Sequence, residues 1–308
     1  MELFITTLLA MGIRLATALI LCAFGETFSQ RSGVLSIGIE GYMAFAALMG
    51  FAGSYWTGNP WLGALLAVAA AGAMSLVHGY LCITWGFSQM VSGIGIILFA
   101  GGLTSFAFGK IFGHFSTLPK VKFFEVVNVP MFSEIPMIGP ILFRHALLTY
   151  AAFLLIPLFY FVFYRTKFGL KIRAVGEYAA GSDTMGINVH IIRYICTLLS
   201  GVMSGWAGAF LSLGISHSFQ EGMIAGRGFI VLAAIVLGNW NPLRVFGACL
   251  LFGTVDALQY KMQILKYWGI PYAFWLMLPY IVATGTLVIT RKTRQPSELT
   301  IPYLREQA

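Results

Sequence analysis

Residues 165–193, RTKFGLKIRAVGEYAAGSDTMGINVHIIR, form a polar stretch between two long apolar runs, and they hold five of the chain's 19 Lys and Arg residues. The roughly 20 residues on either side are apolar enough to lie in lipid. Basic loops of membrane proteins lie mostly on the cytoplasmic side. The stretch therefore predicts a membrane protein that presents a docking surface to a soluble partner.

The composition of the whole chain predicts the same class. Hydrophobic residues make up 58% of the 308 residues and charged residues 10%, whereas soluble domains carry about 25% charged residues. The net charge of +8 gathers at the ends of apolar runs, which favours a role in membrane topology over binding to nucleic acid. We expect an all-α, polytopic membrane helix bundle, with residues 1–308 forming a single transmembrane domain.

Apolar runs of about 20 residues are the criterion for spanning helices. The seventh and eighth runs are short and are separated only by Asn239–Pro242, which is typical of the discontinuous helices of transporters. Gly201, Gly205 and Gly208 predict close approach between neighbouring helices. About nine spans are expected, at 4–24, 34–54, 61–85, 90–109, 145–164, 194–215, 228–240, 245–260 and 272–290.

Charge then predicts the orientation. With residues 165–193 cytoplasmic, the tail 291–308 is also cytoplasmic, while the loop 110–142 and the N-terminus are external. This arrangement puts eleven Lys and Arg residues inside and seven outside. The loop 110–142 is expected to form a small external cap, either to meet a binding protein or as a passive surface. The first apolar run is interpreted as a retained span rather than a cleaved signal peptide.

No motif for catalysis or for a cofactor occurs. The chain lacks a phosphate-binding G-x-x-x-x-G-K-[ST] loop, an H-E-x-x-H motif and a G-x-S-x-G motif. Its five His and four Cys residues are scattered without metal-ligand spacing. We expect no enzymatic activity, no catalytic residues, no resident cofactor and no metal.

Ionisable residues inside apolar runs are costly and are candidates for function. Arg14, Glu40 and Asp256 lie deepest in such runs. Asp256 is expected to pair with Arg14 or to reach toward Lys261. Buried carboxylates also serve proton-coupled transporters, so a self-sufficient secondary transporter that uses Glu40 and Asp256 is the alternative function.

Two polar, glycine-containing segments interrupt the apolar pattern, at 25–41 and 221–230. Lipid does not tolerate irregular backbone, so both segments are expected to face a cavity. Their positions in opposite halves of the chain suggest a possible inverted repeat. Glu26, at the end of the first predicted span, is expected to pair with Arg31.

A family resemblance rests on five motifs in this order and spacing. These are SGVLSIGIEG at 32–41, KFGLKIRAVGE at 167–177, GINV at 186–189, GRGFI at 226–230 and WNPL at 240–243. The set closely resembles the permease subunits of bacterial ABC importers for nucleosides and simple sugars, within the branched-chain amino-acid permease superfamily. The resemblance covers residues 20–290.

The resemblance implies a pore-forming subunit in the bacterial cytoplasmic (inner) membrane. Such a subunit pairs with a second permease, usually a paralogue. A cytoplasmic ATPase uses the ATP, and an external binding lipoprotein or periplasmic protein delivers the cargo. The implied cargo is a nucleoside or a related ribose- or ribityl-bearing solute such as a simple sugar or riboflavin.

The polar stretch 165–193 matches the family's coupling loop, which docks on the ATPase. From the residues, a short helix from Glu177 to Met185 is expected, followed by a left-handed Gly186. The predicted coupling residues are Arg173, Glu177, Tyr178, Met185, Gly186 and Ile187.

The expected solute pathway follows the polar starts of two spans. The candidate pathway residues are Ser36, Glu40, Ser88, Gln89 and Ser92. Many relatives carry an Asn-Glu pair where this chain has Ser88 and Gln89, and an Asn at Ile97. These departures bear on the identity of the cargo rather than on the mechanism.

Overall fold

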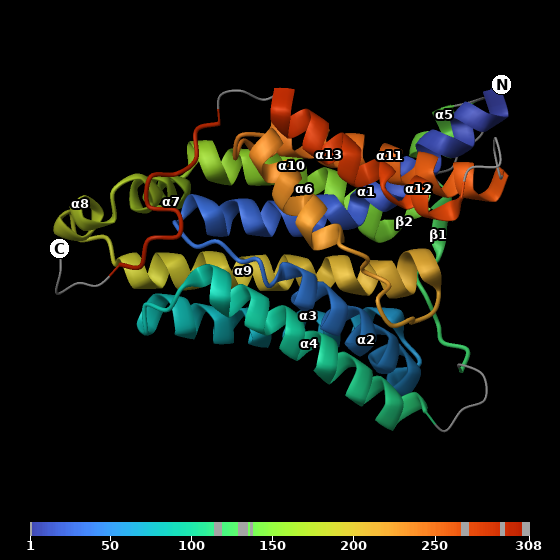
Figure 1. Cartoon of the computed structure of the whole chain (residues 1–308), viewed down its shortest axis with the longest axis horizontal. Helices are drawn as coiled ribbons and strands as arrows, with labels where there is room; N and C mark the ends of the chain where they lie inside the picture. Colours follow the sequence, from blue (N-terminus) through green and yellow to red (C-terminus); the bar gives the residue numbers. More distant parts are fainter. Residues whose placement is uncertain are drawn as a thin grey trace.

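The computed structural model describes residues 2–113, 119–128, 135, 138–265, 271–289 and 293–303. They form a bundle of α-helices (Figure 1), as predicted, with one two-stranded ribbon within the described part. The elements are α1 (Glu2–Arg31), α2 (Ile39–Thr57), α3 (Pro60–Gly79), the π-helical η1 (Tyr80–Thr84), α4 (Gln89–Phe112), β1 (Val126–Asn128), α5 (Ile138–Leu142), β2 (Arg144–Ala146), α6 (Leu147–Arg165), α7 (Lys167–Glu177), α8 (Ala179–Thr184), α9 (Val189–Phe210), the π-helical η2 (Leu211–Ser216), α10 (Arg227–Leu237), α11 (Pro242–Leu265), α12 (Tyr272–Leu276) and α13 (Leu278–Ile289).

Five helical segments in the described part are long and apolar enough to cross a membrane. The other predicted spans correspond to α2, α10, α11 and α12–α13, which fall below these limits of length or hydropathy, so the count of nine is not confirmed. The five segments are Phe4–Arg31, Pro60–Thr84, Gln89–Phe112, Leu147–Arg165 and Val189–Ser216.

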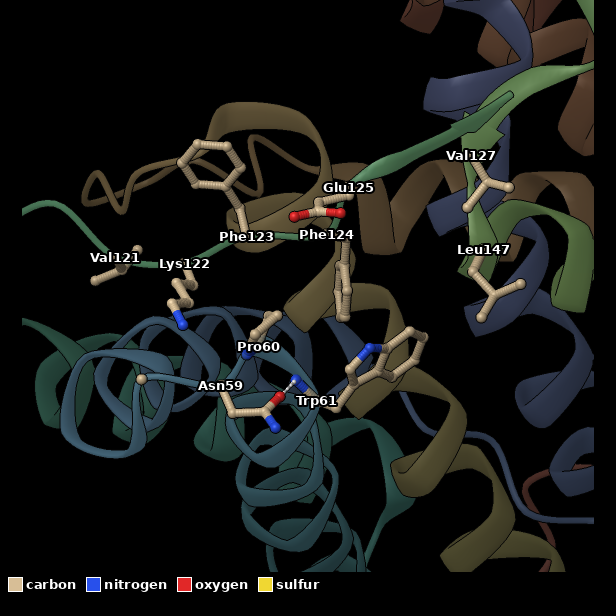
Figure 2. Close-up of a pocket in the computed structure, with 11 residues that line it drawn as sticks. Asn59, Pro60, Trp61, Val121, Lys122, Phe123, Phe124, Glu125, Val127 and Leu147 are labelled. Atoms are coloured by element: carbon tan, nitrogen blue, oxygen red, sulfur yellow. Dashed lines mark hydrogen bonds between the residues drawn. The ribbon is translucent and has the colours of Figure 1, made fainter. Parts of the chain in front are cut away.

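The predicted loop 110–142 is more ordered than expected where it is described. Helix α4 continues to Phe112, α5 occupies the end of the range, and β1 pairs antiparallel with β2. An extended segment, 119–125, crosses the ends of α2 and α3, and Figure 2 shows the cavity that it encloses. There the ring of Trp61 lies 4.8 Å from that of Phe124.

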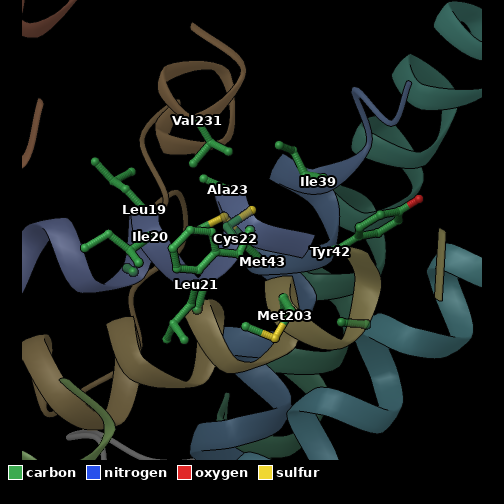
Figure 3. Close-up of a cluster of buried hydrophobic side chains, with 14 of the residues drawn as sticks. Leu19, Ile20, Leu21, Cys22, Ala23, Ile39, Tyr42, Met43, Met203 and Val231 are labelled. Carbon is green, nitrogen blue, oxygen red and sulfur yellow. The ribbon is translucent and has the colours of Figure 1, made fainter. Parts of the chain in front are cut away.

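Helix α1 is the central element of the bundle. Its residues 15–30 are buried on every face, and α6, α9, α10 and α11 pack around it. Figure 3 shows Leu19 and Cys22 of α1 among side chains from α2, α9 and α10. The prediction that the first span ends at residue 24 is wrong, because the polar residues 26–30 find partners inside the bundle and the helix continues to Arg31.

Glycines set the distance between α9 and its neighbours, as predicted. A Cβ added at Gly205 would lie 2.6 Å from the Cα of Val68 in α3. Gly201 faces Ser75 of the same helix, and Gly208 faces α2. The backbones are therefore too close to admit a side chain at these positions.

Within the two predicted segments, irregular backbone is confirmed at residues 32–38 and 221–226, while the rest is helical. The helices that follow these breaks run in opposite directions. Helix α2 starts at Ile39 and leads to Ser54, whose hydroxyl donates to the main chain of Lys122. Helix α10 starts at Arg227, near the beginning of α2. Beyond the end of α10, the Trp240 indole N–H donates to Gln30, at the C-terminal end of α1. This is the arrangement that an inverted repeat produces.

Replacement of Gly205 by Ala is expected to lower the melting temperature of the purified chain. The added methyl group has no room against Val68, and such overpacking costs about 1–3 kcal/mol. Gly102→Ala in α4 is the matched control, since no atom lies within 4 Å of its added Cβ. Equal melting temperatures for the two variants would contradict the packing argument.

Candidate functional site

The first irregular segment, residues 32–38, is held by side chains of α3 and α4. The amide oxygen of Gln89 accepts a hydrogen bond from the Leu35 N–H at 2.7 Å, and its nitrogen donates to the Gly33 carbonyl at 3.3 Å. His78 Nε2 lies 3.2 Å from the Leu35 carbonyl. Gln89, a predicted pathway residue, therefore clamps the backbone of this segment.

Glu26 ties the same segment to α1 and α9. Its carboxylate accepts hydrogen bonds from the Ser36 N–H at 2.9 Å and from the Ser200 hydroxyl at 2.7 Å. The predicted pair with Arg31 does not form, because Glu26 points into the bundle. Arg31 instead lies 3.4 Å from Glu177.

Glu40 joins the two irregular segments. Its carboxylate oxygens accept hydrogen bonds from the N–H groups of Gly226 at 2.8 Å and Gly228 at 2.6 Å. The first N–H groups of a helix have no partner within the helix and carry partial positive charge. Glu40, in the first turn of α2, therefore caps the start of α10.

Arg227, the first residue of α10, is the partner of Asp256. Its guanidinium lies 3.0 Å from the Asp256 carboxylate and 3.0 Å from the Tyr260 hydroxyl. The predicted partners of Asp256 are wrong. Arg14 is exposed, and Lys261 donates to the main chain of α1 at 2.7 Å. The turn before α10 brings Arg227 inside the bundle, where it forms an ion pair with Asp256.

The remaining predicted pathway residues lie at and near the start of α4. Ser88 is exposed, and Ser92 bonds through its hydroxyl to His78 Nδ1 at 3.0 Å. The Ser36 hydroxyl bonds to Tyr42 at 2.9 Å. The five candidates thus lie around the irregular segments. Most of them form hydrogen bonds with other residues of the chain.

Sequence reasoning missed the contributions of His78, Ser200 and Arg227. His78 and Ser200 sit alone in apolar runs, so their neighbours in sequence gave no signal. Arg227 lies inside the glycine-rich motif 226–230, and that position was the available clue.

The predicted coupling loop forms an elbow of two helices. Helix α7 ends at Glu177 and α8 begins at Ala179, with Tyr178 between them in an extended conformation. The short helix predicted between Glu177 and Met185 is found as α8, but it starts at Ala179 because the chain bends at Tyr178. Gly186 closes α8 with a φ of 79°, the left-handed conformation that was predicted.

Two large apolar side chains of the elbow face solvent. Tyr178 is 65% exposed and Met185 is 82% exposed. Beside them lies a shallow cavity of about 360 Å³ that Ile187 also lines. These exposed apolar side chains make the elbow a candidate surface for binding another molecule.

Arg173 and Glu177 turn toward the chain itself. The Arg173 guanidinium lies 5.3 Å from the ring centroid of Tyr164. Glu177 accepts a hydrogen bond from the Ser297 hydroxyl at 3.1 Å, in addition to its ion pair with Arg31. These two residues position the elbow on the bundle.

The C-terminal segment 293–303 links the elbow to the first irregular segment. The Glu298 N–H donates to the Gly176 carbonyl at 2.9 Å, and the Thr300 N–H donates to the Gly33 carbonyl at 3.2 Å. The Glu298 carboxylate also lies 3.7 Å from buried Arg193. Residues 291–292 and 304–308 of the predicted tail lie outside the described residues.

Comparison with known proteins establishes the class. The family of the permease component of the branched-chain amino acid transport system matches residues 8–287, and the chain belongs to this family. It is therefore a multi-pass membrane permease component, which works with an ATPase and a substrate-binding component. Membership favours the predicted permease over the proton-coupled alternative.

Three relatives align with the chain over most of their own length. A putative glucose ABC transporter permease, TsgC13 of Haloferax volcanii, is 38% identical over 85% of this chain and 80% of the relative. The guanosine ABC transporter permease NupQ of Bacillus subtilis is 36% identical over 94% of each chain. The nucleoside ABC transporter permease NupC of Lactococcus lactis is 34% identical over 89% of each.

Replacement of Glu40 by Gln is expected to loosen the start of α10. The amide keeps one acceptor but turns its NH₂ group toward an N–H donor, which leaves a buried group without a partner at a cost of about 1–3 kcal/mol. Ile224→Cys, at a position buried in the wild type, should then react faster with a maleimide. The control is Glu125→Gln, since Glu125 is exposed. Equal reactivity in both backgrounds would contradict a capping role.

Proposed function

We propose that this chain is one of two paralogous permease subunits of an importer for a nucleoside or a related ribose- or ribityl-bearing solute. A separate cytoplasmic ATPase hydrolyses the ATP, and an external binding lipoprotein or periplasmic protein delivers the cargo. The guanosine and nucleoside permeases among the relatives support this cargo class, and the putative glucose permease supports the wider sugar class.

The observation that carries the proposal is the exposed elbow. Tyr178 and Met185 present apolar surface on a rigid support, because Glu177 and Glu298 fix α7 and α8 to the bundle. A soluble ATPase that covers this patch would gain buried apolar area at about 25 cal/mol per Å². The elbow then lies on the cytoplasmic side of the bacterial inner membrane, with the C-terminus inside and the N-terminus outside.

The contacts of the elbow suggest how the ATPase drives transport. Movement of α7 and α8 is transmitted through Glu298 to Gly33 and hence to the segment 32–38. That segment leads into α2, where Glu40 holds the start of α10. Tilting the elbow would therefore displace both broken helices, and we infer that the solute pathway runs beside them.

Gly186→Val is expected to abolish uptake and ATPase association while the chain still inserts in the membrane. Gly186 has a φ of 79°, and a β-branched residue there costs about 1–3 kcal/mol. Gly58→Val is the matched control, because Gly58 has a φ of 65° at the end of α2 and also has open space around it. Co-purification with the ATPase and uptake are the measurements. Wild-type values for Gly186→Val would remove the coupling role.

The orientation is tested with single cysteines at two exposed positions, Glu125 and Met185. A membrane-impermeant maleimide added to intact cells should modify Glu125→Cys and spare Met185→Cys. Background labelling is expected to be low, since all four native cysteines are buried. The reverse pattern would place the elbow outside and overturn the proposed coupling.

A further inference from the structure

A cavity of about 600 Å³ lies among α1, η2, α10, α11 and the C-terminal helices. Its volume is within the range of about 300–1,000 Å³ that small-molecule sites occupy. Most of its lining is apolar, and it includes Leu15, Ile215, Met223 and Leu276. Polar groups reach it from Arg227 and from the face of α11 that carries Asp256, Gln259 and Tyr260.

Gln259 is the buried amide side chain of this cavity. It is only 5% exposed, and it lines the cavity. Within the described residues, the Arg227 Nε and the amide nitrogen of Gln263, one turn further along α11, are buried without a hydrogen-bond partner. A buried polar group without a partner costs about 1–3 kcal/mol, so the retention of polar side chains here requires an explanation.

A carboxamide offers a donor and an acceptor side by side. Heteroaromatic bases offer the complementary pair along one edge, and glutamine recognises adenine in this way in nucleic-acid complexes. A flat base also needs few polar partners on its faces, which suits the apolar walls. A hexose carries hydroxyls around its whole ring and would leave several of them without partners there.

We propose that this cavity binds the planar base of the cargo, with the Gln259 amide pairing to a donor–acceptor edge of that base. The inference rests on the proposed function and narrows its cargo to solutes that carry a heteroaromatic base. Asp256 is held through one oxygen by Arg227 at 3.0 Å, and its carboxylate supplies acceptors for the hydroxyls of an attached ribose.

The position of the cavity connects base binding to the broken helices. Arg227 is fixed on one side by Asp256 and Tyr260 and on the other by the Met223 carbonyl at 2.9 Å. The neighbouring N–H groups of Gly226 and Gly228 donate to Glu40, which lies in the first turn of α2. A rearrangement of that cap would move the wall of the cavity and release the base.

The test is uptake by the assembled transporter, with its ATPase and binding protein, in proteoliposomes. Gln259→Met removes both hydrogen-bonding atoms at nearly constant size. It is expected to lower the maximal rate of guanosine and adenosine uptake about tenfold or more, which is the loss of about 1.4 kcal/mol of interaction. Thr254→Val is the matched control on α11, since Thr254 bonds to its own helix and lies away from the cavity lining.

A binding measurement covers the case in which Gln259→Met assembles poorly. Adenosine at millimolar concentration should raise the melting temperature of the purified permease pair, and the rise should be smaller in Gln259→Asn, whose shorter amide cannot reach as far. Glucose and ribose should raise it in neither protein.

The outcomes separate the two hypotheses. Unchanged nucleoside uptake by Gln259→Met, or an equal fall for nucleosides and for glucose, would overturn base recognition by Gln259 and leave the permease function intact. A wild-type transporter that takes up neither nucleosides nor sugars would overturn the proposed function and the inference with it.

Discussion

The carboxylate of Glu40 at the start of α10 is the interaction on which the rest of the structure depends. Hydrocarbon offers no water to a broken helix, so every free N–H group must find a partner within the protein. Glu40 accepts from Gly226 and Gly228, residues that follow it by 186 and 188 positions. One side chain therefore satisfies the second break and fixes the two halves of the chain against each other.

The same requirement explains why the polar residues of the first half concentrate around residues 32–38. Glu26 and Gln89 accept from the main chain of this segment, and Gln89 also donates to it. A Glu at position 89 would keep the acceptor and lose the donor, so this position sets how firmly the irregular segment is held.

Close packing and hydrogen bonding hold different parts of the permease together. Around α9, contacts at Gly205 and Gly208 are too close to admit a larger side chain without a loss of stability. The broken helices, the elbow and the tail are joined instead by hydrogen bonds and ion pairs such as Glu298 with Arg193. These directional contacts connect the elbow and the tail to the broken helices, while close packing holds the helices around α9 in place.

The sequence by itself determined the all-α membrane class, the irregular segments and the left-handed Gly186, because hydropathy and backbone conformation are set by residues adjacent in the chain. It did not determine the partners of Glu26 and Asp256, the bend at Tyr178 or the place of the Gln259 amide in the lining of a cavity. These depend on which helices pack together, and the candidates nearest in sequence were wrong. In a bundle with so few charges, the pairing of each buried polar group is decided only when all the helices are in place.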